Sequence, residues 1–136
     1  MVEHIDQFEE EERGEILAAA DALAARRHAA ACHADLIEFC RHMQPDYKVG
    51  KHHRILADLL MEIAEGRKDR ICVNIPPRHG KSQLVSIYFP AWFIGKYPNK
   101  KVMMVSHTTD LAVDFGRKVR NIIDTDAYRQ IGRAHV

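Results

Sequence analysis

The sequence predicts an α/β fold that contains the start of a parallel sheet and is preceded by an α-helical segment. Two apolar runs, residues 71–75 and 101–106, are typical of buried strands. Each run is followed by a stretch with helical spacing of its apolar residues, and a long stretch rich in Glu, Ala and Leu precedes both. Repeated strand–helix units form parallel sheets with right-handed crossovers.

The helical segment occupies residues 1–45 and forms the first of two predicted units. Residues 5–31 have a strong helix composition interrupted only by Gly14, which predicts one or two helices. The apolar side is thin, so we expect this part to lie on another element; its members are Ile16, Leu17, Ala20, Leu23 and Ala24. A further helix is expected over residues 34–42, and it must end before Pro45.

A loop and a third helix lead into the second unit, which covers residues 46–130. Residues 44–50 contain Pro, Asp and Gly, which favour a loop. Residues 51–65 then carry one apolar stripe, and Gly66 is a C-terminal stop signal. The stripe consists of Ile55, Leu56, Leu59, Leu60 and Ile63.

The turn between the first apolar run and the next helix has the composition of a phosphate-binding loop. It reads Pro76, Pro77, Arg78, His79, Gly80, Lys81 and Ser82. Backbone N–H groups in a strand–loop–helix turn converge on a phosphate chain, the lysine reaches its terminal oxygens, and the hydroxyl binds Mg²⁺. The Walker A pattern also requires a glycine where this chain has Ile75, so the match is incomplete.

The remaining elements follow from similar signals. A kink or break is expected at Pro90, because proline cannot donate to the carbonyl of Ser86. After the second predicted strand, Thr108, Thr109 or Asp110 can cap a helix that runs to about Ile123. Two strands cannot complete a sheet, so we expect the chain to be the beginning of a longer protein.

Composition and charge are those of a soluble globular protein. The net charge is +1, and no apolar run approaches the roughly 20 residues of a membrane span. The three cysteines, Cys32, Cys40 and Cys72, have no framework spacing, which favours a reducing cytosol. His28, His33 and His42 lie near two of them, but without a Cys-x-x-Cys pair these residues are interpreted as packing residues.

Four segments taken together resemble the large terminase subunit of tailed bacteriophages. They are residues 45–53, the loop 76–82, residues 89–92 and residues 106–116, and the resemblance covers about residues 34–123. It implies a RecA-like P-loop ATPase that drives double-stranded DNA into a capsid, followed in the family by a ribonuclease-H-like nuclease. It also implies ATP and Mg²⁺ as cofactors, a homo-oligomeric ring, the portal protein and small terminase subunit as partners, and the host cytoplasm as location.

Carried over by position, the resemblance assigns roles to individual residues. Pro77, Arg78, His79, Gly80, Lys81 and Ser82 would bind the ATP phosphates, with Ser82 as the Mg²⁺ ligand. Arg78 would also sense the γ-phosphate. The adenine side would be formed by Tyr47, His52 and His53, and no glutamine occupies the expected base-reading position.

The sequence lacks other parts of that machine. No strand after Val105 supplies the acidic residue that holds Mg²⁺ or the glutamate that positions water, and no nuclease domain follows. We therefore expect this chain alone to be inactive as an ATPase. Residues 131–136 are expected to be a non-native tail, because they resemble the translation of a common sequencing adapter. Two alternatives stay open: a fragment of a helicase-like DNA translocase, and a non-catalytic helical binding module.

Overall fold

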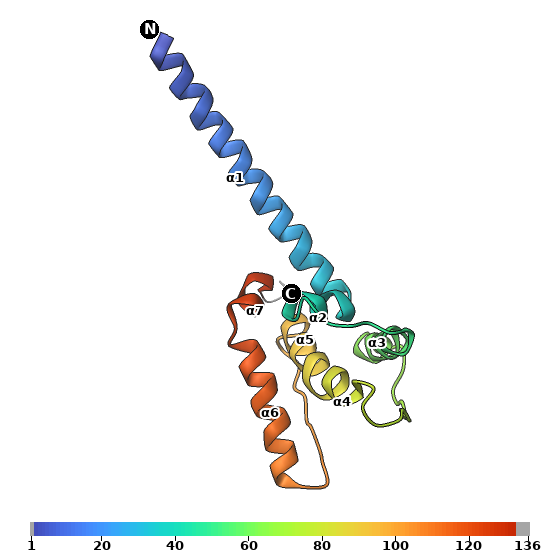
Figure 1. Ribbon diagram of the computed structural model, residues 1–136. Helices are drawn as coiled ribbons and strands as arrows, with labels where there is room; N and C mark the ends of the chain where they lie inside the picture. The colour runs from blue at the N-terminus through green and yellow to red at the C-terminus, as the bar shows by residue number, and fades with distance from the viewer. Residues whose placement is uncertain (1, 133–136) are drawn as a thin grey trace.

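Helices are the only regular elements in residues 2–132, the part of the chain that the computed structural model describes (Figure 1). They are α1 (Val2–Ala34), α2 (Leu36–Met43), α3 (Lys51–Ala64), α4 (Lys81–Gln83), the π-helical η1 (Leu84–Tyr88), α5 (Phe89–Lys96), α6 (Thr109–Ile123) and α7 (Asp126–Ile131). The predicted α/β fold with a parallel sheet, and with it the partial RecA-like architecture, is therefore wrong for this structure.

The two predicted strands are extended segments without sheet partners. Within the described chain, residues 71–76 and 101–107 make no backbone–backbone hydrogen bonds and form no ladder. A strand, unlike a helix, needs a second segment to satisfy its N–H and C=O groups. The apolar pattern found the extended conformation, but it could not supply the pairing that makes a strand.

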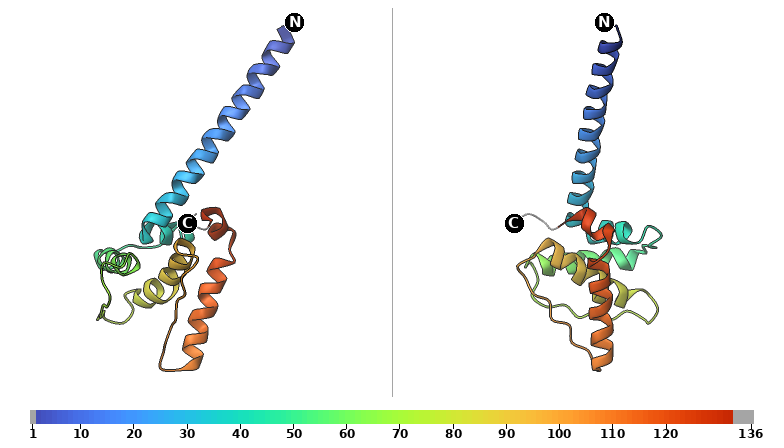
Figure 2. Two further views of the ribbon diagram at one scale, coloured as in Figure 1. Left: turned by 180° about the vertical axis from the view of Figure 1, so that it is seen from behind. Right: turned by 90° about the vertical axis from the view of Figure 1, so that its left-hand side faces the viewer.

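Helix α1 is one long helix that points away from the rest of the protein (Figures 1 and 2). Its C-terminal end contacts α2, α5 and α7. Between residues 10 and 28 its side chains are exposed, including Ile16 at 68% and Leu17 at 64%. The prediction that this stretch lies on another element is thus wrong for the described structure. None of the described helices is long and apolar enough to cross a membrane.

The core lies where the end of α1 meets α2 and α5. Trp92 is 1% exposed, and its indole Nε1–H donates to the backbone oxygen of Cys32 over 2.9 Å. The fully buried neighbours are Leu36, Ile37, Leu84, Cys32 and Cys40. Because the indole N–H is paired, the large aromatic side chain can be buried without an unsatisfied donor.

Helix α7 closes this core from the other side and was not predicted from the sequence. The Thr125 hydroxyl accepts from Tyr128 N–H and caps the helix, and the Tyr128 hydroxyl donates to the Ala91 oxygen over 2.8 Å. Ile131, the first residue of the predicted non-native tail, ends α7 and is buried. Residues 133–136 of that tail lie outside the described residues.

The other helices largely match the sequence signals. Asp35 caps α2 by accepting from Ile37 N–H, and Gly66 follows α3 with a left-handed φ of 73°. Among the proposed caps of α6, Thr108 is the one used. Pro90 does not break its helix, because the π-helical turn η1 directly precedes it and α5 accepts proline in its first turn.

Candidate phosphate-loop site

The loop at residues 76–82 curls around a hollow of about 240 Å³ before the chain enters α4. Two of its residues have left-handed backbone conformations, Arg78 with φ of 67° and Gly80 with φ of 74°. Lys81 and Ser82 both line the hollow. The first N–H groups of a helix have no carbonyl one turn earlier to bond, so those of α4 are free to face a ligand.

Two histidines hold the shape of this loop. The His79 ring donates from Nδ1 to the backbone oxygens of Pro76 and Pro77, at 3.2 and 3.0 Å. From α3, the His52 ring donates from Nε2 to the His79 oxygen over 3.2 Å. The loop is therefore tied to itself and to the start of α3, which restricts the conformations it can adopt.

Gly80 marks the closest approach between the loop and α3. A Cβ at this position would lie 2.7 Å from Nε2 of His53. The Gly50 N–H donates to His53 Nδ1 over 2.9 Å, which leaves the ring proton on Nε2, facing the loop. Burial lowers the pKa of His53, with the neighbouring His52 adding to the effect, so a neutral ring stands behind the loop.

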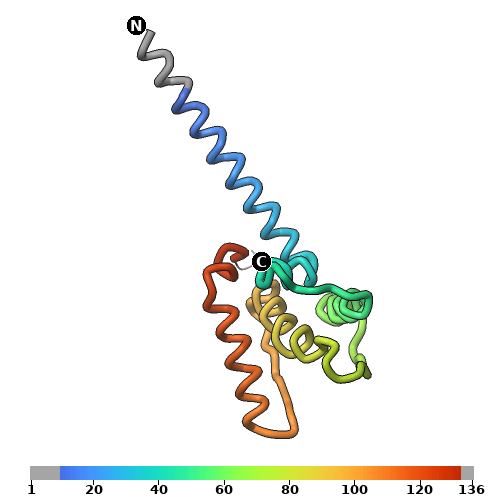
Figure 3. Tube along the Cα trace, viewed as in Figure 1, coloured from blue at the N-terminus to red at the C-terminus, as the bar shows by residue number. Residues whose placement is uncertain are grey.

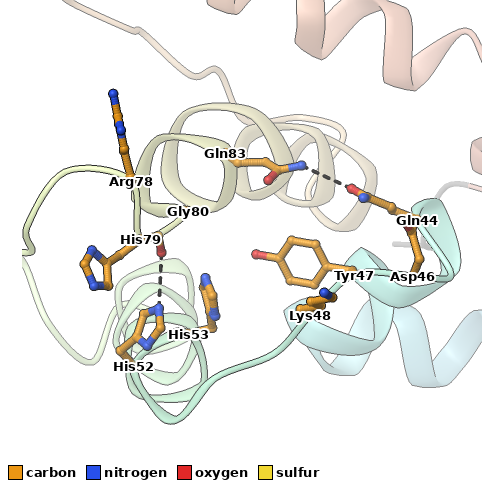
Figure 4. A pocket seen from close by; sticks show the side chains of 10 residues that line it. All are labelled: Gln44, Asp46, Tyr47, Lys48, His52, His53, Arg78, His79, Gly80 and Gln83. Atoms are coloured by element: carbon orange, nitrogen blue, oxygen red, sulfur yellow. Dashed lines mark hydrogen bonds between the residues drawn. The ribbon is translucent and has the colours of Figure 1, made fainter.

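The loop and the start of α3 form two walls of one cleft of about 430 Å³ (Figure 4). The third wall is the connection between α2 and α3. The lining residues are Gln44, Asp46, Tyr47, Lys48, His52, His53, Arg78, His79, Gly80 and Gln83. Four of them, Arg78, His79, Gly80 and Gln83, also line the loop hollow, so the two spaces are adjacent.

Tyr47 is the main aromatic surface of the cleft, and Figure 4 shows its ring between the walls. Its ring centroid lies 5.8 Å from that of His53 and 5.5 Å from that of Tyr88. The buried Tyr47 hydroxyl has no hydrogen-bond partner, and burial raises its pKa to about 12. A buried polar atom without a partner costs free energy, so this hydroxyl is a source of local instability beside the cleft.

The structure places most of the predicted site residues together and adds two glutamines that the sequence analysis did not select. Tyr47, His52 and His53 share the cleft with the loop, whereas Lys81 and Ser82 line only the adjacent hollow. The Gln83 amide donates to the Gln44 side-chain oxygen over 3.1 Å. No local motif marks Gln44, because it lies at the end of α2 and reaches the site only through folding.

The remaining polar residues set the charge of the site. Lys48 and Asp46 stand on the α2–α3 connection, while Arg78 and Lys81 belong to the loop. In Figure 4 the Arg78 side chain points away from Tyr47. Two cations on the loop side and an aromatic ring on the opposite side suit a ligand with a phosphate end and a flat end.

Comparison with known proteins identifies no relative of this chain. No family model, curated protein or solved structure matches it.

Proposed function

We propose that the chain binds ATP with Mg²⁺, the phosphates in the loop hollow and the base in the adjacent cleft, as the N-terminal part of a phage DNA-packaging motor. The observation that carries the proposal is the meeting of residues 44–53 with residues 76–83 around one cleft. Its volume of about 430 Å³ falls in the usual range for small-molecule sites.

The phosphate half of the proposal rests on Lys81, Ser82 and the loop backbone. Lys81 would pair with the terminal phosphates, and the Ser82 hydroxyl would be an Mg²⁺ ligand. Arg78 would reach the γ-phosphate. The base half rests on Tyr47, whose ring offers a stacking face, and on the amides of Gln44 and Gln83, which offer donors and acceptors to the edge of a purine.

Titration of a fluorescent ATP analogue with Mg²⁺ tests the phosphate half. We expect Lys81→Ala to weaken binding roughly 10- to 100-fold, since a hydrogen bond to a charged group contributes about 1.5–3 kcal/mol. Lys100→Ala removes one exposed lysine outside the site and should leave binding unchanged. Equal weak binding by wild type and Lys81→Ala would contradict the proposal and favour the helical binding module, which the all-helical structure also suits.

Tripolyphosphate separates the base half from the phosphate half. Tyr47→Ala should weaken ATP binding roughly tenfold through lost stacking, yet leave tripolyphosphate binding nearly unchanged. Loss of both ligands by a Tyr47→Ala variant whose far-UV circular dichroism spectrum matches that of wild type would contradict the division of the site into a base half and a phosphate half.

The motor role and the lack of turnover are separate parts of the proposal. We expect the chain alone to hydrolyse ATP only at the background rate, because in residues 2–132 no strand presents the acidic residues that would hold Mg²⁺ and position water. Turnover that disappears in Lys81→Ala would contradict this. Double-stranded DNA, the portal protein, the small terminase subunit and a ring of identical subunits are the partners proposed for the longer protein.

A further inference from the structure

A cluster of two histidines and one cysteine lies at the junction of α1 and α2, away from the phosphate loop. His28 and Cys32 stand one turn apart on α1, and His42 comes from α2. Their ligand atoms all lie within 4.8 Å of one another. His28 Nε2 is 2.8 Å from His42 Nδ1 and 3.7 Å from the Cys32 sulfur.

We propose that this cluster is a Zn²⁺ site with His28 Nε2, Cys32 Sγ and His42 Nδ1 as ligands and a fourth position open to water. Imidazole and thiolate are ligands that zinc prefers over the oxygen-seeking cations Mg²⁺ and Ca²⁺. The site is independent of the proposed nucleotide function.

The two ligand distances that start at His28 Nε2 are within about 0.6 Å of those around a tetrahedral zinc ion. Zinc–nitrogen bonds of about 2.0–2.1 Å and zinc–sulfur bonds of about 2.3 Å place tetrahedral ligands about 3.4 Å apart for two nitrogens and about 3.6 Å apart for nitrogen and sulfur. The sulfur of Cys32 is already 3.7 Å from His28 Nε2. The two imidazole nitrogens must separate by about half an ångström, and the exposed His28 ring has room to do so. Cys32 Sγ and His42 Nδ1, which lie up to 4.8 Å apart, must approach to about 3.6 Å when the ion binds between them.

The second nitrogen of His42 supports the same assignment. It donates from Nε2 to the backbone oxygen of Ala127 in α7 over 2.8 Å. A carbonyl can only accept, so the His42 proton is on Nε2 and Nδ1 presents its lone pair to His28 and Cys32. A hydrogen bond from the far nitrogen to a carbonyl is the usual support for a metal-binding histidine, because it fixes both ring orientation and tautomer.

Zinc binding exchanges existing contacts for metal bonds. Without metal, His28 Nε2–H donates to His42 Nδ1, and the Cys32 thiol donates to the backbone oxygen of Glu38 over 3.8 Å. When zinc binds, the His28 proton moves to Nδ1, the Cys32 thiol releases its proton to solvent, and three metal–ligand bonds form. The ion would then join the base of α1 to α2 and, through His42, to α7.

Cobalt(II) is the probe that reports the ligands directly. Added to the full chain, it should bind in a one-to-one ratio with a thiolate-to-cobalt charge-transfer band, and Zn²⁺ should displace it. We expect His28→Gln and Cys32→Ser to weaken binding by more than about 100-fold, beyond the loss typical of supporting residues alone. His28→Gln is the decisive variant, because the exposed His28 can be replaced without disturbing the core.

Two control variants distinguish this site from nonspecific metal binding by exposed side chains. His107→Gln and Cys72→Ser remove one exposed histidine and one exposed cysteine outside the cluster, and both should bind cobalt like wild type. Absence of saturable binding overturns the proposal. Binding that survives in a folded His28→Gln variant, or that is lost in Cys72→Ser, overturns it as well.

Discussion

Residues 89–94 and residues 101–106 are both apolar, yet the first segment forms part of the core and the second is largely exposed. In α5, Trp92 and Ala91 are at most 1% exposed. In the second segment, Met103 is 87% and Val105 is 83% exposed. A helix satisfies its own backbone and can bury one side at once, whereas an extended segment depends on a partner strand. Apolar composition alone therefore does not decide burial.

The other extended segment, residues 71–75, lies between these two cases. Ile71, Val73 and Ile75 pack against the core, while Cys72 and Asn74 are exposed. This alternation is the side-chain period of an extended chain. The segment that leads into the phosphate loop is therefore anchored on one face, and the segment from 101 to 106 much less so.

The largest expected effect is at Trp92. Trp92→Ala removes the largest fully buried side chain and leaves the Cys32 oxygen without its donor, so unfolding free energy should fall by about 3–5 kcal/mol. Urea denaturation followed by far-UV circular dichroism measures it, because the only tryptophan is then gone. A loss below about 1 kcal/mol would mean that this helical core does not carry the stability.

A pair of glycine variants compares the loop with the exposed helix. Gly80→Ala forces a left-handed residue and places its Cβ against His53, so we expect a loss of about 1–3 kcal/mol. Gly14 lies in α1 with nothing near its added Cβ, and Gly14→Ala should stabilise the helix by about 0.5–1 kcal/mol. Thermal melts of both variants test the pair, and effects of the same sign would contradict it.

The helices were predictable because their signals are local. The stripe of α3, the Thr108 cap and the Gly66 stop each depend on residues within one or two turns. The sheet was not predictable in this way, because strand pairing depends on segments far apart in sequence. Helix α7 has a local cap at Thr125, but it is too short for an apolar stripe, and its core contact from Tyr128 to Ala91 is non-local.

The residues of the candidate site also differ in whether a local signal could identify them. The loop residues Gly80, Lys81 and Ser82 could be selected from a contiguous motif. Gln44 could not, because its position beside Gln83 results from the packing of α2 against η1 and α5. The cluster of His28, Cys32 and His42 has no standard zinc spacing, and only the junction of α1 with α2 brings it together.

The next effect is a pH dependence of the unfolding free energy, caused by His53 in the first turn of α3. Burial lowers the pKa of His53 below its ordinary value of 6.5, so the unfolded chain takes up a proton before the folded protein does. Stability from this group is present above about pH 6.5 and is lost as the pH falls toward the lower folded pKa. Unfolding free energy should therefore decrease between about pH 7.5 and about pH 5.5.

His53→Gln removes the titrating group but keeps an acceptor for the Gly50 N–H, as in a capping box. We expect the pH slope of unfolding free energy to be smaller in this variant than in wild type. Urea denaturation at about pH 7.5 and about pH 5.5 gives the change in unfolding free energy for each protein. If that change is the same in wild type and His53→Gln, His53 titrates in the folded protein as it does in the unfolded chain.

The smallest effects are expected in the exposed segment, where two adjacent methionines make the sharpest comparison. Met103 is 87% exposed, so Met103→Ser should change the unfolding free energy by less than about 0.5 kcal/mol. Met104 points to the other side and packs against the core, so Met104→Ser should cost more, about 1–2 kcal/mol. Chemical denaturation of both variants measures the difference. Equal costs would mean that the segment packs on both faces, which would remove the contrast between the helical core and the extended chain.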